Sequence, residues 1–566
     1  MPFLVAKVVG GRRYWQIVTS RRVDGKPRQV VLAHLGSADK LLERLSSGEQ
    51  KPLKARVLQF GLIGAAWNLA EELGLVELID RHIPKRRQGP TVGQYLLLAT
   101  LNRLVQPTSK AKLADWYQKT ALTRWMRLPR RALASQRFWD HMDAVGEPAI
   151  RAIEAELSQK LVEKFQLDLK CLCFDCTNFD TFIDSKTPSE LAQRGHAKSK
   201  RTDLRVVGLA LMVSTDFDVP LFHQVYPGNQ ADSVTFANVV ESLADRCRLL
   251  SRDIEHVTLV FDKGNNSKEN LQEVVDSPYH VVGSLVPSQH AALLAVSLEE
   301  FQGFSSPRLE TVTAYRTKKE VFGHSWTIVV TRSEELLQGQ LRGIAQQLRK
   351  RRRELDDLQR KLRRSQKPGA KGKGYTLESL QKHADKLGSG QYIKDILDIK
   401  VGKRGKKLTL TYRTKPSALE SLTRTVLGKR ILFTDNHDWT TEEIILAYRS
   451  QHHVEAAFRQ MKDSHCISWQ PMHHWTDQKI RVHSFYCVLA FTLLCLLHRM
   501  ACKAGIPVTV PALLDELNSI EEVVNLYASG TTGQRGRPRA ETTYSETSPT
   551  AQKLSKLFQL DKLKVK

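Results

Sequence analysis

Three acidic side chains stand where a metal-dependent nuclease places its ligands: Asp175, Asp262 and Glu455. The first two end the apolar runs 171–174 and 257–261, so each is expected at the end of a buried strand. The third falls in an expected helix, 442–463. Two acids on strands and one on a helix can converge on one point, and carboxylate oxygens suit Mg²⁺. A pair of such ions can drive in-line attack on a phosphodiester, so the set predicts DNA cleavage.

The expected helix carries a polar stripe around its acid. Its members step by three or four residues: Tyr448, Gln451, Glu455, Arg459 and Lys462. Tyr448 and Lys462 each lie about 10 Å along the axis from Glu455. The acid can therefore hold a metal while the flanking tyrosine and cations contact DNA phosphates. On spacing alone, a surface helix with an ordinary Glu–Arg pair explains the stripe equally well.

The charge of the chain favours a nucleic-acid partner. Its 566 residues suffice for three or four domains, and a hydrophobic share of 41% is ordinary for a globular protein. A net charge of +26 with a pI near 9.7 is not ordinary. A solvated basic surface is the alternative, but such an excess more often accompanies DNA or RNA.

No segment predicts export or a membrane span. The N-terminal apolar residues are broken by Gly-Gly-Arg-Arg at 10–13, so we expect no secretory signal. The longest apolar stretch, 484–497, is shorter than the roughly 20 residues that a span needs, and a buried core helix is expected. The eight cysteines are expected as free thiols. The cysteines around Asp175 do not predict zinc, because their spacing on a strand sends them to inconsistent faces. These features predict a cytoplasmic protein.

Periodicity predicts the elements that position the acids. Residues 14–18 and 29–32 flank Asp24-Gly25, a dipeptide that favours a β-hairpin turn. Residues 55–150 have helical periodicity. Residues 170–286 alternate strands and helices, which predicts an α/β core built on one sheet.

The residues between the second and third acids are expected to form an inserted subdomain that belongs to neither flanking pattern. It should contain two strands within 309–331, a long helix at 334–364 and two more strands, 408–414 and 430–434. The basic run 349–353 on the helix is either a solvated face or an arm that faces DNA. Residues 535–539 near the C-terminus resemble an AT-hook, although a disordered basic linker explains them as well.

Several histidines and tryptophans have open roles. His452, His453, His473 and His474 flank the Glu455 helix and are expected to contact phosphates or lie on the surface. Trp326 and Trp439 could stack on a flipped base, but core packing is the favoured role for both.

The motifs together resemble one family. Tyr448, Glu455 and Lys462 fit the Y-x2-R-x3-E-x6-K signature of bacterial insertion-sequence DDE transposases, the cut-and-paste group known as insertion-sequence family four. The resemblance covers roughly residues 170–499 and includes these segments: 174–178, 194–198, 227–232, 261–267 and 471–475. The N-terminal hairpin is similar to one branch of the group. One departure is Gln451, which stands where the signature has arginine and gives up a bidentate cationic contact.

The resemblance implies an RNase H-like α/β catalytic core that depends on Mg²⁺ or Mn²⁺, with two ions held by the three acids. It implies that activated water cuts double-stranded DNA at the terminal inverted repeats and that the freed 3′-hydroxyl attacks target DNA. It also implies a homodimer that synapses two ends, in a bacterial, nucleoid-associated protein. DNA contacts are expected at six residues: Tyr448, Gln451, Arg459, Lys462, Lys198 and Lys263.

On this basis the chain is expected to divide into six parts. They are an N-terminal β-hairpin region at 1–50, a helical DNA-binding domain at 51–165, the first part of the RNase H-like core at 166–288, a β-rich insertion with a basic long helix at 289–435, the catalytic and apolar helices at 436–505, and a C-terminal helix with a basic tail at 506–566. Two alternatives remain: a domesticated protein that binds DNA without cutting it, and a non-transposing nuclease of the same fold. Retention of all three acids argues against the first.

Overall fold

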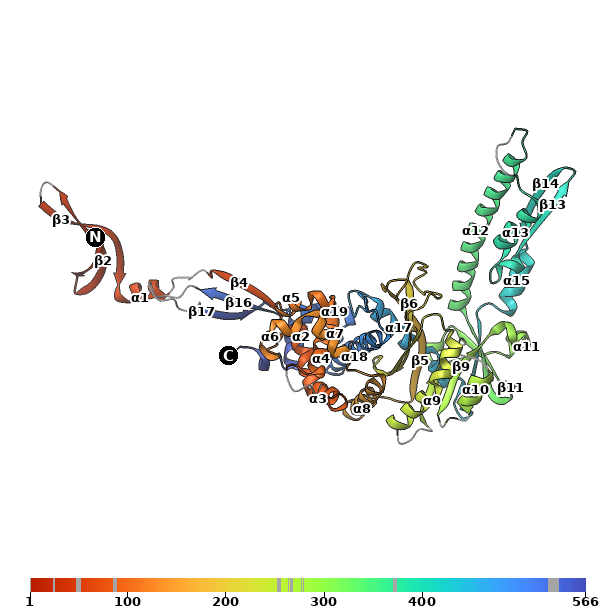
Figure 1. Cartoon of the computed structure of the whole chain (residues 1–566), viewed down its shortest axis with the longest axis horizontal. Coiled ribbons are helices and arrows are strands. Elements are labelled where there is room, and N and C mark those ends of the chain that lie inside the picture. The colour runs from red at the N-terminus through yellow and green to blue at the C-terminus, as the bar shows by residue number, and fades with distance from the viewer. Residues whose placement is uncertain are drawn as a thin grey trace. The chain divides into compact units, whose positions relative to one another are not determined.

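The computed structural model (Figure 1) describes residues 2–23, 26–46, 52–84, 89–251, 256–262, 264, 268–275, 277, 279–369, 374–527 and 539–565. Lys263, the Asp24-Gly25 turn and residues 535–538 lie outside the described residues. The chain forms two compact units. The first contains residues 1–60, 520–546 and 565–566, and the second contains 61–519 and 547–564.

The first unit begins with a three-stranded antiparallel sheet in the order β1-β2-β3. The expected hairpin is confirmed as β2 (Arg12–Val23) and β3 (Lys26–Ser37). β1 (Pro2–Val9) was not expected, and it pairs along its whole length with β2. Gly10 and Gly11 join these two strands with φ angles of 57° and 77°, a conformation in which glycine has no Cβ to clash.

A second sheet of this unit joins segments from the two ends of the chain. Its order is β17-β16-β4, with β4 at Lys54–Gln59, β16 at Glu521–Tyr527 and β17 at Arg539–Tyr544. The expectation of helix from residue 55 was therefore wrong for the first five residues. The tail after the C-terminal helix is likewise not only a polar linker. Local periodicity missed both because β4 is completed by a partner more than 460 residues away.

The second unit is built on a nine-stranded mixed sheet in the order β10-β11-β12-β15-β9-β8-β5-β6-β7. Five consecutive strands of the chain form one side of it, with β7 at the edge: β5 (Cys171–Thr181), β6 (Arg205–Ser214), β7 (Pro220–Pro227), β8 (Thr258–Val260) and β9 (His280–Leu285). β5, β8 and β9 run parallel, whereas β6 and β7 continue from β5 as antiparallel neighbours. This arrangement is an RNase H-like mixed α/β sheet.

The expected insertion is not a separate subdomain over its whole length. Its strands β10 (Gln302–Gly303), β11 (Val312–Val321), β12 (His324–Ser333) and β15 (Lys429–Thr434) extend the nine-stranded sheet beyond β9. Residues 334–428, between β12 and β15, leave the sheet as one long segment, and we call them the arm. The sequence misassigned the sheet strands because antiparallel hairpins look alike whether they are isolated or added to a larger sheet.

The arm contains the expected long helix, α12 (Glu334–Ser365). It also contains α13 (Leu377–Gly388), α14 (Ile393–Ile396), β13 (Leu397–Arg404), β14 (Lys407–Thr414) and α15 (Pro416–Thr425). β14 pairs with β13 and not with a strand of the main sheet.

The two faces of the central sheet carry different helices. Phe174 of β5 and Phe261 after β8 both contact Phe236 of α9 (Asp232–Leu250), at ring distances of 5.5 and 5.1 Å. Alternation along a strand sends their neighbours Asp175 and Asp262 to the opposite face. That face carries α16 (Thr441–Arg449) and α17 (His452–Lys462).

A buried helix and a helical module complete the second unit. α18 (Asp477–Lys503) is apolar and long enough to span a membrane, but 94% of its most apolar window is buried inside the protein. This confirms the buried core helix expected at 484–497. α2 (Gly61–Glu72) and α4 (Val92–Val105) pack on α18, so the helical region shares one compact unit with the nine-stranded sheet.

Candidate active site

Asp175 lies on β5, and Asp262 lies level with it, two residues past the end of the neighbouring parallel strand β8. Cys173 pairs with Val260, and each aspartate follows its strand's paired residue by two positions. Their side chains therefore share one face, on backbones roughly 4.8 Å apart. The expectation that Asp175 ends its strand was wrong, because β5 continues to Thr181. It is β8 that ends here, at Val260.

Glu455 enters the same region from α17. It is exposed and lines a pocket of about 290 Å³ together with Asp262, Tyr448 and Gln451. Within the described residues, no three Asp, Glu, His or Cys side chains lie close enough to form a ready metal cluster. The structure therefore brings the elements of the three acids to one face without gathering their carboxylates into one ligand set.

Tyr448 is tied to Asp262. Its hydroxyl donates a hydrogen bond to Asp262 Oδ1 at 3.0 Å, and the Ser284 hydroxyl donates to the same oxygen at 3.1 Å. Burial and the nearby Asp262 charge raise the pKa of Tyr448 to about 12, so the phenol keeps its proton and remains a donor. This differs from the predicted phosphate contact, because the tyrosine is buried and already bonded inside the protein. Ser284 was missed, since nothing in the strand pattern of 280–286 marks one serine.

Gln451 also differs from its predicted role. It is buried, and its Nε2 donates to the Phe174 carbonyl at 2.9 Å, one residue before Asp175. The predicted continuous helix breaks at this point, with α16 ending at Arg449 and α17 beginning at His452. Gln451 thus fastens α17 to the strand of the first acid and is not an exposed DNA contact.

Two lysines lie beside the first acid. Lys462 Nζ donates to Thr177 Oγ1 at 2.6 Å, and the Lys198 ammonium donates to the Cys176 carbonyl. Although much of the Lys462 side chain is exposed, its ammonium is partly enclosed. Its burial and the charge of Lys198 lower the pKa of Lys462 to about 8, against the opposing effect of Asp180 and Asp175. Arg459 is exposed on α17 and does not line the pocket that contains Asp262 and Glu455, which we call the acid pocket.

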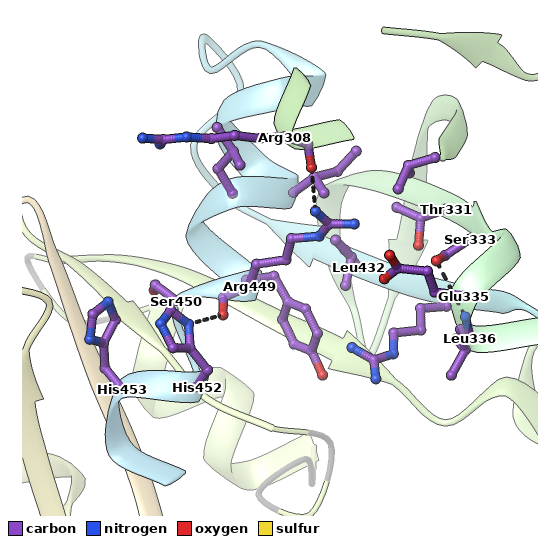
Figure 2. A pocket seen from close by; sticks show the side chains of 15 residues that line it. Arg308, Thr331, Ser333, Glu335, Leu336, Leu432, Arg449, Ser450, His452 and His453 are labelled. Carbon is purple, nitrogen blue, oxygen red and sulfur yellow. Dashed lines mark hydrogen bonds between the residues drawn. The ribbon is translucent and has the colours of Figure 1, made fainter. Parts of the chain in front are cut away.

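A larger basic pocket adjoins the acid pocket (Figure 2). Its volume is about 860 Å³, and it shares four lining residues with the acid pocket: Arg430, Tyr448, Arg449 and His452. Arg449 donates to the Arg308 carbonyl at 2.6 Å, and the Arg430 guanidinium lies 5.7 Å from the centre of the Tyr448 ring. Arg308 and Arg430 were not expected at the site, because they come from outside the signature segments.

Comparison with known families decides the identity. Residues 171–493, more than half of the chain, match the family described as Transposase DDE domain. The chain belongs to the DDE transposases. Residues 6–56 match the N-terminal domain of the IS1634 family of transposases. An insertion-sequence transposase is therefore supported, but the assignment to family four is not confirmed, because IS1634 is a distinct family.

Other comparisons add little to this assignment. No curated protein matches the transposase. Among solved structures, it is similar to a piggyBac transposase synaptic complex with hairpin DNA, at 10% identity and a TM-score of 0.36. That similarity covers 84% of this chain and 81% of the other.

Two further expectations for the transposase are confirmed, and one is wrong. The eight cysteines are free, as expected, and burial raises the pKa of Cys171 to about 11 and that of Cys173 to about 12, which keeps both as thiols. Trp326 is buried in the core, as favoured, and donates to the Val321 carbonyl. His474 was wrongly expected near phosphates or the surface, because it is buried against His483 of α18.

Proposed function

We propose that this DDE transposase cuts DNA at the terminal inverted repeats of its own insertion sequence and joins the freed 3′ ends to target DNA. Asp175, Asp262 and Glu455 would be its catalytic residues. The observation that carries the proposal is the level placement of Asp175 and Asp262 on the face that receives the Glu455 helix. The family match supplies the reaction class, and the Tyr448, Glu455 and Lys462 spacing supports kinship with the family-four group.

The donor chemistry fits a divalent metal, on which DDE transposases in general depend. The three candidate ligands are carboxylates, and hard oxygen donors of this kind suit Mg²⁺ or Mn²⁺. Asp175, Asp262 and Glu455 would hold two such ions. When bound, the ions would supply Lewis-acid stabilisation of the attacking and leaving oxygens of the phosphodiester.

The residues around the acids act by positioning. Tyr448 and Ser284 fix one oxygen of Asp262 through two hydrogen bonds, which leaves the orientation of that carboxylate set before DNA arrives. Gln451 and Lys462 attach α17 to β5 on either side of Glu455. The same two attachments set the distance between the first and third acids.

The cations near the site would hold the DNA. Lys198 and Lys462 place positive charge beside Asp175, and Arg459 extends from the exposed side of α17. With Lys263, these residues would contact phosphates of the transposon end, which fixes the register of the duplex without reading its bases. Tyr448 and Gln451 would act on the DNA only through the acids and the helix that they position.

Single substitutions of the acids test the proposal. Asp175→Asn, Asp262→Asn and Glu455→Gln should each abolish Mg²⁺-dependent cleavage of a duplex that carries an inverted repeat, while binding of that duplex stays within about threefold. Asp245→Asn is the matched control, because Asp245 is exposed and belongs to a surface pair with Arg248. Full cleavage by any of the three variants would overturn the assignment.

The products separate the alternatives. Joining of a cleaved 3′ end to a second duplex identifies a transposase, cleavage without joining identifies a nuclease of the same fold, and binding without cleavage identifies a domesticated DNA-binding protein. A homodimer that pairs two ends would appear by native mass spectrometry as two chains with two end duplexes. One chain with one duplex at every concentration would contradict it.

A further inference from the structure

Positive charge is concentrated in the arm. Residues 334–428 contain 24 lysines and arginines against ten aspartates and glutamates, a net charge of +14 out of +26 for the whole chain. A surface with this density of cations attracts polyanions and raises the rate at which they associate. No part of the acid site accounts for this charge.

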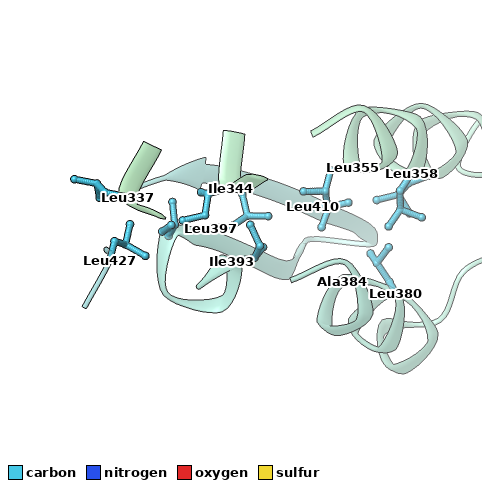
Figure 3. Packing of buried hydrophobic residues seen from close by; sticks show 12 residues of the cluster. Leu337, Ile344, Leu355, Leu358, Leu380, Ala384, Ile393, Leu397, Leu410 and Leu427 are labelled. Carbon is cyan, nitrogen blue, oxygen red and sulfur yellow. The ribbon is translucent and has the colours of Figure 1, made fainter. Parts of the chain in front are cut away.

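The core of the arm explains why α12 is long and where its apolar face lies (Figure 3). Leu337, Ile344, Leu355, Leu358 and Leu362 of α12 are all buried, and they pack against residues of α13, α14, β13 and β14. The leucine spacing of α12 is therefore satisfied inside the arm. Among the described arm residues, Leu377 is the one large apolar side chain that is exposed.

The opposite face of α12 carries a stripe of exposed arginines: Arg342, Arg349, Arg353, Arg360 and Arg364. We call these five the arginine stripe. Successive members are seven or four residues apart, so at 100° per residue they return to one side of the helix, away from the buried leucines. The stripe spans about 33 Å at 1.5 Å per residue. One turn of B-form DNA is about 34 Å, so the stripe matches the spacing at which a duplex presents the same groove again.

The far end of α12 adds a second basic surface. The Gln366 side chain bonds to both the amide and the carbonyl of Leu408, which places the end of α12 beside the start of β14. Residues 360–369 and 400–413 contain five and six lysines and arginines and no acidic residue. The exposed cations at the tip of the β13–β14 hairpin are Lys403, Arg404, Lys406 and Lys407.

The near end of α12 connects the arm to the site. Ser333, Glu335 and Leu336, at the start of the helix, line the basic pocket that adjoins the acid pocket. From these observations we propose that the arm binds the sugar-phosphate backbone of duplex DNA, with the arginine stripe following about one helical turn outward from the active site. Contact is with phosphates, so it is independent of base sequence.

A second copy of the chain fits the arginine stripe less well than DNA does. The face of α12 that carries the arginine stripe offers no apolar surface for packing, and the same face on a second copy would repel it by like charge. Arg342, Arg349, Arg353 and Arg364 have no acidic partner among the described residues, whereas Arg360 is paired with Asp357. These four guanidinium groups, of which Arg349 donates from Nε to the Ala345 carbonyl, are available for phosphate oxygens, which arginine binds in a bidentate manner.

The test uses the full chain with Asp262→Asn, so that bound DNA is not cut. The stripe variant carries Arg349→Gln, Arg353→Gln and Arg364→Gln. The matched control carries Lys382→Gln, Lys386→Gln and Lys394→Gln, which remove three exposed charges from α13 and α14 of the same arm. For a 40-base-pair duplex of arbitrary sequence, the stripe variant should bind at least tenfold more weakly near 150 mM salt. The slope of log affinity against log salt should fall by about 3, near one for each phosphate contact.

The control should change affinity less than threefold, and circular dichroism should show equal helix content in both variants. Hydroxyl-radical footprinting should lose about ten base pairs of protection in the stripe variant alone. Equal weakening in both variants would overturn the proposal, because it would reflect net charge only. Unchanged DNA binding, with loss of self-association or of binding to anionic vesicles, would also overturn it by assigning the stripe to another partner.

This inference rests on the proposed function only in taking DNA as the partner, and the two can fail separately. Stripe-dependent binding by a protein that never cleaves an inverted repeat would remove the proposed function and leave the arm's role intact. For the cleavage measurement, the stripe variant is made with Asp262 restored. Normal cleavage and normal DNA binding by this variant would remove the arm's proposed role and leave the proposed function intact.

Discussion

The Tyr448 hydroxyl lies 3.0 Å from Oδ1 of Asp262 and donates a hydrogen bond to it. The two residues are 186 positions apart, yet this bond connects the signature helix to the second acid of the site. Ser284 reaches the same oxygen from β9, so one carboxylate oxygen has two neutral donors. The tyrosine of the signature thus acts on the acid as well as lying beside the basic pocket.

Loss of this hydroxyl should weaken catalysis more than folding. Tyr448→Phe keeps the buried ring but removes a hydrogen bond worth about 1 kcal/mol. We expect cleavage to fall about tenfold and the requirement for Mg²⁺ to rise, with a small loss in Tm. Tyr412→Phe is the control, because it also removes a tyrosine–aspartate hydrogen bond, in the arm at Asp356. Equal cleavage by Tyr448→Phe and wild type across a Mg²⁺ titration would contradict the positioning role.

Restoring the arginine of the signature at position 451 should not improve DNA binding. Gln451 is buried against the Phe174 carbonyl, so Gln451→Arg would place a charge where a neutral amide is enclosed. Burial of a charge without a partner costs several kcal/mol, and we expect a loss of about 2 kcal/mol in urea unfolding. Affinity for an inverted-repeat duplex should stay equal or fall. Tighter binding with an unchanged unfolding midpoint would mean that the arginine reaches phosphate.

DNA binding should depend on pH through Lys462. Its pKa is lowered to about 8 by burial and by Lys198, so the ammonium loses its proton just above neutral pH. Affinity for DNA should therefore fall between pH 7.5 and 9, roughly by the single phosphate contact that this charge can make. Lys462→Arg keeps the charge throughout that range and should flatten the profile. A profile that is the same in both proteins would assign the titration elsewhere.

Through Lys462, a rise in pH should affect folding stability in the opposite direction to DNA affinity. Its folded pKa of about 8 lies below the unfolded value of 10.5, so the unfolded chain binds more protons between these two values. The contribution of Lys462 to stability therefore rises with pH across this window and is least favourable below pH 8. Urea unfolding of wild type and Lys462→Arg at pH 7 and pH 9.5 would show the difference in slope.

Local sequence patterns were enough to locate the three acids but not to identify the hydrogen bonds that hold them in place. Apolar runs located β5 and β8, and helical spacing located Glu455, because each of these patterns lies within about ten residues. The contacts of Tyr448 with Asp262 and of Gln451 with Phe174 join segments 186 and 277 residues apart, and no periodicity records them. The break between α16 and α17 was invisible because Ser450 and Gln451 keep helical backbone angles.

The inserted residues also show that local sequence patterns identify elements but not the partners with which those elements pack. The strand and helix patterns of 309–434 were recognised, but the pairing of β12 with β15 and of β15 with β9 decides that three of these strands, β11, β12 and β15, belong to the nine-stranded sheet. In the arm, the leucine spacing of α12 indicated a buried face without identifying what covers it. The covering elements α13, α14, β13 and β14 are short, and their own patterns are weak.

The level placement of Asp175 and Asp262 makes a prediction that does not need DNA. Two carboxylates level with each other, one on β5 and one just past the end of β8, repel each other by roughly 1 kcal/mol where solvent screens them. Without divalent metal, Asp175→Asn should therefore raise the Tm. With Mg²⁺ or Mn²⁺ the order should reverse, because the wild type gains stability from a bound ion and the variant loses a ligand. Differential scanning fluorimetry in chelator and at several metal concentrations measures both effects, with Asp245→Asn expected to follow the wild type. If Asp175→Asn were less stable than wild type in chelator and responded equally to metal, the two aspartates would not share an ion, and the metal assignment of the pair would fall.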